Sequence, residues 1–241
     1  VYAWTHMMIT ASGKPVRGEY WPCCNWTPHN DTILKNKKFD VQNKTVKEFW
    51  QSDEMNQIRN MMLEGKAIAG CTACYQEERN GTASLRKQEN NGWTRIKEFP
   101  KIEDTIERWK QTGVCDDPVS FDINFSSLCN LKCRMCFSGL SSELAKEQNH
   151  ILSKEGWDNN DELMRFSTDD LEIIDHGKNN KLMNELYDLM HNTKRIYLKG
   201  GEPSLLQTMY NYLDYPVDKD YAKNIQLKFN TNMTNVQKRF V

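Results

Sequence analysis

The segment Cys129–Cys136 constrains this chain most, because it places three cysteines at CxxxCxxC spacing. It follows an alternating run, residues 119–125, whose pattern predicts a β-strand. Three thiols cannot all pair with one another as disulfides, so clustered cysteines favour a metal site. Iron-sulfur clusters usually take four cysteine ligands, and a loop that supplies three leaves one iron without a protein ligand. Zinc is the alternative, but all-cysteine zinc sites normally close with a fourth thiol.

A second motif, Gly200-Gly201-Glu202-Pro203, comes directly after the predicted strand at residues 194–199. Glycines at the end of a strand let the backbone approach a ligand closely, and the Glu202 carboxylate can accept hydrogen bonds from an ammonium group. Taken alone, the motif is also an ordinary turn with proline at a helix start.

Together, the CxxxCxxC loop after one strand and the GGEP motif after the next resemble the radical S-adenosylmethionine (radical SAM) superfamily. The resemblance implies a 4Fe-4S cluster held by Cys129, Cys133 and Cys136. Its open iron would bind the methionine part of S-adenosylmethionine (SAM). Reductive cleavage of SAM would then give a 5′-deoxyadenosyl radical that abstracts hydrogen from a substrate, which is chemistry of the oxidoreductase or transferase type.

The same resemblance implies which residues hold SAM. Met135 would pack near the adenine, and residues 200–202, Gly200, Gly201 and Glu202, would hold the methionine end. Relatives often carry a TN-containing third strand end that faces SAM. Asn230 and Asn232, at the end of the predicted strand 225–230, are therefore further candidates.

The first part of the chain carries a second group of cysteines. Residues 2–10 are apolar and predict a strand, and a turn at residues 11–15 separates them from residues 18–24, which predicts a hairpin. The hairpin would bring Cys23 or Cys24 back toward the CxxC pair at residues 71–74, so that three or four thiols could converge on a metal. A redox dithiol and a pair of buried thiols remain alternatives for the CxxC pair.

Gly18-x4-Cys23 followed by Cys71-xx-Cys74 is similar to the SPASM and twitch domains, which hold an auxiliary 4Fe-4S cluster in many radical SAM enzymes. This resemblance implies a second cluster, with Cys23, Cys24, Cys71 and Cys74 as candidate ligands. Those domains have another cysteine before the glycine, which this sequence lacks, and in most relatives they follow the core domain. Truncation ahead of Val1 would explain the missing cysteine, and an incomplete cluster is the alternative.

The elements alternate between strands and helices, which implies parallel pairing with ligands at the carboxyl ends of the strands. We expect an α/β fold: a partial (β/α) barrel of radical SAM type in residues 115–241, with the first three βα units, preceded by a small α+β cysteine-containing domain in residues 1–114. Both ends look cut, so a fragment is expected. Residues 153–181 are polar and predict an exposed insertion. Cys115 stands alone and is interpreted as a packing residue.

Composition narrows the classes of function. The 32 Lys and Arg residues balance 33 Asp and Glu residues, so nothing indicates a nucleic-acid or anionic membrane partner. No apolar run approaches the roughly 18 to 20 residues needed to span a bilayer and no leader is evident, which predicts a soluble cytoplasmic protein. Hydrolase and NTPase motifs are absent.

Relatives with auxiliary clusters often modify peptides, so a peptide or protein substrate is expected by analogy, with flavodoxin or ferredoxin as the type of electron donor. The alternatives are a non-enzymatic zinc or iron-sulfur scaffold that binds a partner protein, and a fragment that binds a cluster but is inactive.

Overall fold

A computed structural model of the chain describes residues 1–11, 18–27, 30–34, 39–95, 99–155, 173–235 and 238. Residues 12–15 of the predicted turn and residues 156–172 of the predicted insertion lie outside this part of the chain.

The described residues form a five-stranded sheet in the order β2-β1-β3-β4-β5. The strands are β1 (His6–Ile9), β2 (Tyr20–Trp21), β3 (Ser120–Asn124), β4 (Arg195–Lys199) and β5 (Gln226–Phe229). β1 pairs antiparallel with β2 and parallel with β3, and the pairs β3–β4 and β4–β5 are also parallel. The predicted hairpin and the three later strands are therefore confirmed. The sheet is open within the described residues, which form no closed barrel.

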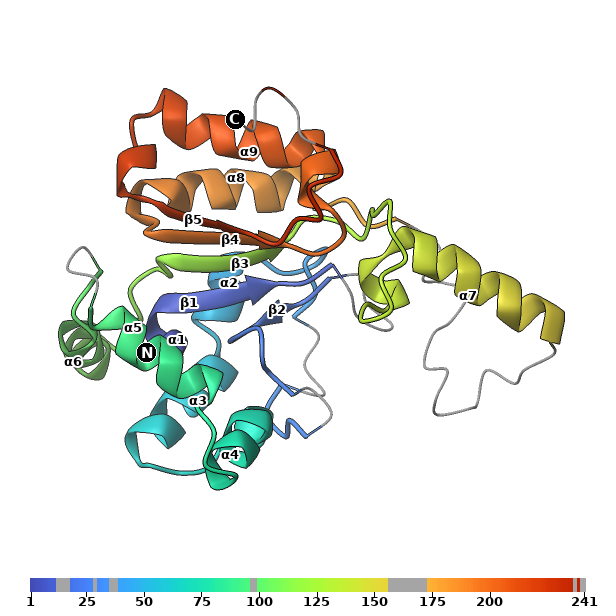
Figure 1. The fold of residues 1–241 in the computed structure, drawn as a ribbon. Helices are drawn as coiled ribbons and strands as arrows, with labels where there is room; N and C mark the ends of the chain where they lie inside the picture. The colour runs from blue at the N-terminus through green and yellow to red at the C-terminus, as the bar shows by residue number, and fades with distance from the viewer. Residues whose placement is uncertain are drawn as a thin grey trace.

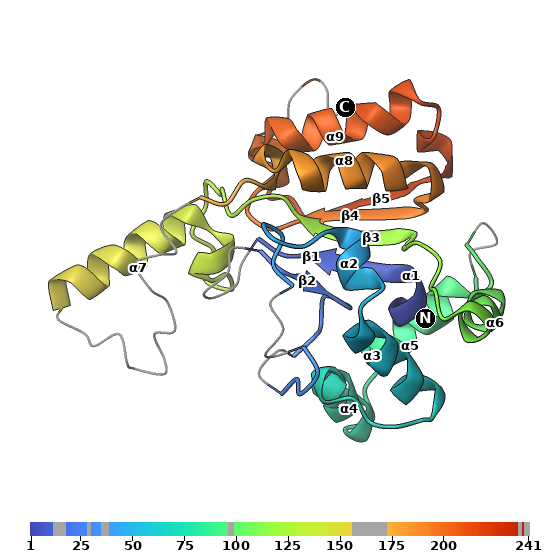
Figure 2. The ribbon, with the colours of Figure 1, turned by 180° about the vertical axis from the view of Figure 1, so that it is seen from behind.

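Helices connect and flank these strands (Figure 1). The α-helices are α1 (Tyr2–Thr5), α2 (Val46–Trp50), α3 (Asp53–Leu63), α4 (Thr72–Arg79), α5 (Leu85–Trp93), α6 (Ile102–Thr112), α7 (Ser142–Glu155), α8 (Asn180–Leu189) and α9 (Gln207–Asp218). Short 3-10 turns lie at Ala69–Cys71, Ser138–Leu140, His176–Lys178, Met190–Asn192, Pro203–Leu205 and Ala222–Asn224. In both ribbon views α8 and α9 cover one face of the sheet, α3 and α4 lie on the other side, and α7 extends away from the body (Figures 1 and 2).

Strand β3 is buried along its whole length, because the sheet is covered on both faces at this point. Phe121 and Ile123 alternate along β3 and belong to one apolar cluster with Leu186 of α8 and Met209 of α9. Ser120, Asp122 and Asn124 alternate with them and therefore lie on the opposite face, which the N-terminal residues cover.

Local sequence sets the helix ends in the N-terminal part. The Ser52 hydroxyl caps α3 by accepting a hydrogen bond from the Met55 amide at 3.2 Å. Gly65 and Gly113 follow α3 and α6 with φ angles of +68° and +71°, a left-handed conformation that glycine adopts without steric cost.

The prediction of a strand from residue 2 onward was wrong for its first half. Residues 2–5 form the helical turn α1, and the strand begins at His6. The reason is tertiary: Trp4 is buried, and the Ala3 carbonyl accepts a hydrogen bond from Arg59 Nε of α3 at 2.8 Å. These contacts override the extended preference of an aromatic run.

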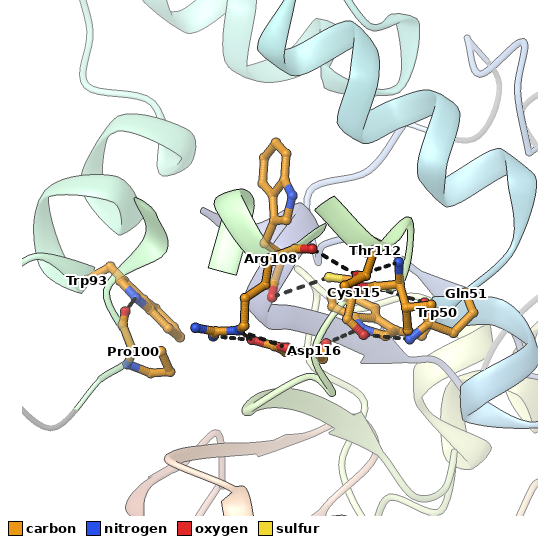
Figure 3. A network of polar contacts seen from close by, with 10 residues as sticks. Trp50, Gln51, Trp93, Pro100, Arg108, Thr112, Cys115 and Asp116 are labelled. Carbon is orange, nitrogen blue, oxygen red and sulfur yellow. Dashed lines mark hydrogen bonds and ion pairs between the residues drawn. The ribbon is translucent and has the colours of Figure 1, made fainter. Parts of the chain in front are cut away.

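A set of polar contacts at residues 50–51 ties α2 to the segment that leads into β3 (Figure 3). The Gln51 side chain donates to the Cys115 carbonyl at 2.6 Å and accepts from the Cys115 amide at 3.1 Å. Trp50 Nε1 donates to the Asp116 carbonyl at 2.7 Å, and Arg108 of α6 pairs with the Asp116 carboxylate. Cys115 itself is buried in the core, which agrees with its interpretation as a packing residue.

The apolar core is continuous across the two predicted domains. One cluster contains Trp4 and Ile58 from the N-terminal part together with Phe121, Leu186 and Met209. Parallel pairing of β1 with β3 joins the same two parts through the backbone. The boundary between residues 1–114 and 115–241 stays a prediction.

Among the described residues, no helix has both the length and the apolar character that crossing a membrane requires.

Replacing Gln51 with alanine is expected to lower the free energy of unfolding by about 1–3 kcal/mol, because both backbone groups of Cys115 lose their partners. Urea unfolding of the folded chain measures this difference. The exposed Gln57→Ala on α3 is the matched control and should change stability by less than about 0.5 kcal/mol. Equal losses in the two variants would contradict this account.

Candidate functional site

The three-cysteine loop lies directly after β3, at the carboxyl ends of the parallel strands. Cys133 is exposed, while Cys129 and Cys136 are partly buried. The Cys136 amide donates to the Cys133 carbonyl at 2.9 Å, which folds the loop back on itself. Burial raises the pKa of the Cys136 thiol, and the nearby Cys129 and Cys133 raise it further.

Two serines at the start of α7 hold this loop in place. The Ser142 hydroxyl accepts from the Cys129 amide at 3.1 Å and donates to the Cys129 carbonyl at 3.0 Å. The Ser141 hydroxyl donates to the Leu131 carbonyl at 2.8 Å. A neutral hydroxyl that serves both backbone groups of one cysteine fixes that residue without using its sulfur.

The GGEP turn packs against the three-cysteine loop. The Glu202 amide donates to the Leu128 carbonyl at 2.7 Å, and the Gly201 amide donates to the Leu140 carbonyl at 3.1 Å. A Cβ atom on Gly201 would lie 2.2 Å from the Leu128 oxygen, and its φ of +57° is left-handed. Only glycine fits here without displacing the residue next to Cys129.

The Glu202 carboxylate is buried, with 1% of its surface exposed, and protein donors engage both of its oxygens. Oε1 accepts from the Ser204 amide at 3.0 Å and from the Thr231 hydroxyl at 2.6 Å, and Oε2 accepts from the Asn232 amide at 2.6 Å. Burial raises the pKa of Glu202, but these hydrogen bonds more than offset it, and the net pKa is lowered. Its direct bond to an ammonium group stays a prediction.

The end of β5 joins the same region through one of the two predicted asparagines, Asn232. Asn232 Nδ2 donates to Asn130 Oδ1, inside the three-cysteine loop, at 2.9 Å. Asn130 Nδ2 donates in turn to the Thr234 hydroxyl at 2.7 Å. Asn230 instead accepts from the Tyr197 hydroxyl at 2.7 Å. Asn232 thus contacts the loop, while Asn230 lies beside β4.

Met135 leaves its side chain almost fully in solvent, with 97% of its surface exposed. An apolar side chain in this position is available to cover a ligand. Its packing against an adenine stays a prediction.

Sequence reasoning missed Asn124, the last residue of β3. Its side chain is buried and lies within 3 Å of the position that a Cβ on Gly200 would occupy. Asn124 Oδ1 has no hydrogen-bond partner among the described residues. Polar residues alternate with apolar ones along residues 120–124, and this alternation could have identified Asn124 from the sequence.

A second group of cysteines, in the N-terminal part of the chain, lines a cavity. Cys23, Cys71 and Cys74 line a cavity of about 550 Å³, with Cys71 ending a 3-10 turn and Cys74 in the first turn of α4. The backbone amide of Asn25 donates to Cys23 Sγ at 3.2 Å, and its side-chain Nδ2 donates to Cys74 Sγ at 3.4 Å. Burial raises the pKa of Cys71 to about 11, and the neighbouring Cys74 adds to the rise.

Cys24 has different neighbours. A hydrogen bond between the two adjacent thiols raises the pKa of Cys23 and lowers that of Cys24. Asp122 of β3 raises the pKa of Cys24 and Lys199 of β4 lowers it, and the side chains of Asp122 and Lys199 form an ion pair at 3.0 Å. Sequence reasoning did not single out this pair, which only the register of β3 and β4 brings together.

The chemistry of both donor sets fits an iron-sulfur cluster. Thiols are the ligands that such clusters take, and the N–H groups of Asn25 supply hydrogen bonds to sulfur of the kind that tune them. Among the described residues, no group of three or more His, Cys, Asp or Glu side chains is arranged to hold a single metal ion. A 4Fe-4S cluster differs from a site for a single metal ion because each of its cysteine thiolates binds a different iron atom.

Residues 1–75 match the family model of the SPASM domain, an iron-sulfur cluster-binding domain. The matched segment contains Cys23, Cys24, Cys71 and Cys74 and ends before the three-cysteine loop. Searches of curated proteins and of solved structures found no match. The N-terminal part is thus similar to domains that bind iron-sulfur clusters, as predicted.

Gly201→Ala is expected to destabilise the protein more than Gly81→Ala. Both residues have positive φ, so each alanine costs about 1–2 kcal/mol, but a Cβ on Gly81 meets nothing within 4 Å. The clash with Leu128 should add about 1–3 kcal/mol for Gly201→Ala. Urea unfolding compares the two variants, and equal losses would show that the turn does not depend on this close approach.

Glu202→Gln should be less stable than the wild type near neutral pH, by an amount that shrinks in acid. Because the folded pKa of Glu202 is lowered, its contribution is present above the unfolded pKa of about 4.3 and is lost as pH falls through the folded value. Unfolding measured at a series of pH values tests this. Glu103→Gln, at an exposed position, is the control, and a pH-independent difference for Glu202→Gln would refute the argument.

Proposed function

We propose that this chain is a radical SAM enzyme that cleaves SAM reductively at a 4Fe-4S cluster held by Cys129, Cys133 and Cys136. The observation that carries the proposal is the packing of the GGEP turn on the three-cysteine loop, where the Glu202 amide donates to the Leu128 carbonyl at 2.7 Å. Two motifs that are some 60 residues apart in the sequence meet at one edge of the sheet.

The residues at this edge could hold SAM. When bound, the cluster would supply one electron that breaks a C–S bond of SAM and gives a 5′-deoxyadenosyl radical, which takes hydrogen from the substrate. Asn124 Oδ1, a buried acceptor with no described partner, lies beside Gly200 and could accept from the amino group of the methionine part. Met135 would cover the adenine and exclude water.

Glu202 would act mainly as a positioning residue. Its carboxylate joins the GGEP turn to the end of β5 through the Thr231 hydroxyl and the Asn232 amide, and Asn232 continues to Asn130 in the cysteine loop. These bonds hold three strand ends in one arrangement before any ligand binds.

The remaining parts of the proposal rest on analogy. They are a partial (β/α) barrel in residues 115–241, an auxiliary cluster in the N-terminal domain, a peptide or protein substrate, a flavodoxin or ferredoxin as electron donor, and a cytoplasmic location. The SPASM match at residues 1–75 supports the iron-sulfur part.

Reconstitution of the full-length protein with iron and sulfide in the absence of oxygen tests the proposal. The wild type should form 5′-deoxyadenosine from SAM when reduced. The Cys129→Ala/Cys133→Ala/Cys136→Ala variant should lose about four irons relative to the wild type, together with all 5′-deoxyadenosine. Cys115→Ala is the matched control and should keep both. Stoichiometric zinc without iron uptake, or iron without SAM cleavage, would favour a non-enzymatic scaffold instead.

A further inference from the structure

Met233, which follows β5, has a left-handed backbone with a φ angle of +56°. Among the described residues other than glycine, only Asp220 shares this conformation, with a φ angle of +57°. Aspartate tolerates it because its short polar side chain can form hydrogen bonds with the nearby backbone, whereas methionine has no such group. Met233 therefore holds a costly conformation that its own side chain does not explain.

Hydrogen bonds on both sides keep Met233 in this conformation. Its amide donates to the Thr231 hydroxyl at 3.1 Å. Its two neighbours in the sequence, Asn232 and Thr234, both bond to the side chain of Asn130 in the three-cysteine loop, at 2.9 Å and 2.7 Å. Residues that the surrounding structure fixes in a strained conformation cluster at ligand-binding sites.

The segment that carries Met233 is thus tied to the loop that carries Met135. The side chains that tie them, Asn130 and Asn232, use their polar groups on each other. Met233 and Met135 instead leave 54% and 97% of their surfaces exposed, so neither is packed in the apolar core. The thioether sulfur of methionine makes favourable contacts with aromatic rings. A flat aromatic group of a ligand therefore suits these two side chains.

We propose that Met233 contacts the adenosine part of SAM and, together with Met135, forms the apolar side of its binding site. Adenine is the aromatic group of SAM, and the strained backbone keeps the Met233 thioether exposed at the edge where the CxxxCxxC loop and the GGEP turn meet. This inference rests on the proposed function, and it adds to the SAM site a residue that lies outside both motifs.

Binding measurements on the full-length protein, reconstituted with iron and sulfide in the absence of oxygen, test the inference. Met233→Ala removes the thioether but keeps a side chain that restricts the backbone. Equilibrium dialysis should show SAM and 5′-deoxyadenosine binding about fivefold to tenfold more weakly, because apolar contact area is lost. Methionine alone should bind within about twofold of the wild type, and Met233→Leu, which keeps the apolar volume, should bind SAM within about threefold.

Two glycine variants separate the side chain from the backbone. Met233→Gly and Asp220→Gly each place glycine at a left-handed position, where it has no steric cost. Neither variant should lower the midpoint of urea unfolding. Only Met233→Gly should weaken the binding of SAM, because Asp220 lies on the surface after the end of α9.

Three results would overturn the inference while the proposed function stands. They are wild-type affinity for SAM in Met233→Ala, an equal loss of affinity for methionine and for 5′-deoxyadenosine in that variant, and a clear fall in the urea midpoint of Met233→Gly, which would make the side chain part of the folded core. A wild type that holds iron but binds no SAM would overturn the proposed function, and this inference with it.

Discussion

Parallel hydrogen bonding of β3 to both β1 and β4 is the constraint on which the other features depend. Because all five residues of β3 are buried, both of its faces must pack against other residues. Phe121 and Ile123 meet α8 and α9 in the apolar core, and Asp122 meets Lys199 and His6 on the other face. The register of one strand therefore determines where both cysteine groups lie relative to the sheet.

The buried ion pair between Asp122 and Lys199 matters more for where the two side chains lie than for the free energy of unfolding. Desolvation of two charges can cancel most of their attraction, so such a pair is weak evidence for added stability. Burial raises the pKa of Asp122, but His6 and Lys199 more than offset this effect, and the carboxyl stays ionised. A charged carboxylate at this point fixes the Lys199 side chain against β3.

Prediction from sequence succeeded where local rules dominate and failed where contacts are remote. The sequence pattern identified β3, β4 and β5 and the alternation of strands with helices. The same reasoning extended the first strand over residues 2–5, because it had no means of seeing Arg59 bind the Ala3 carbonyl. It left open whether Cys23 or Cys24 approaches the CxxC pair, since adjacent residues carry no information about which way each side chain points; in the structure Cys23 lines a cavity with Cys71 and Cys74.

By itself, the sequence determined the chemistry that is available: thiols at CxxxCxxC and CxxC spacing, a diglycine turn, and strands whose order brings their carboxyl ends to one edge. The spacing of residues and the alternation of strands with helices are local properties, so they can be recognised without the tertiary structure. Only the tertiary structure decided that Gly201 packs on Leu128, that Asn124 is left without a described partner beside Gly200, and that Asp122 pairs with Lys199. Each of these depends on the register between strands that are distant in sequence, and no local pattern specifies that register.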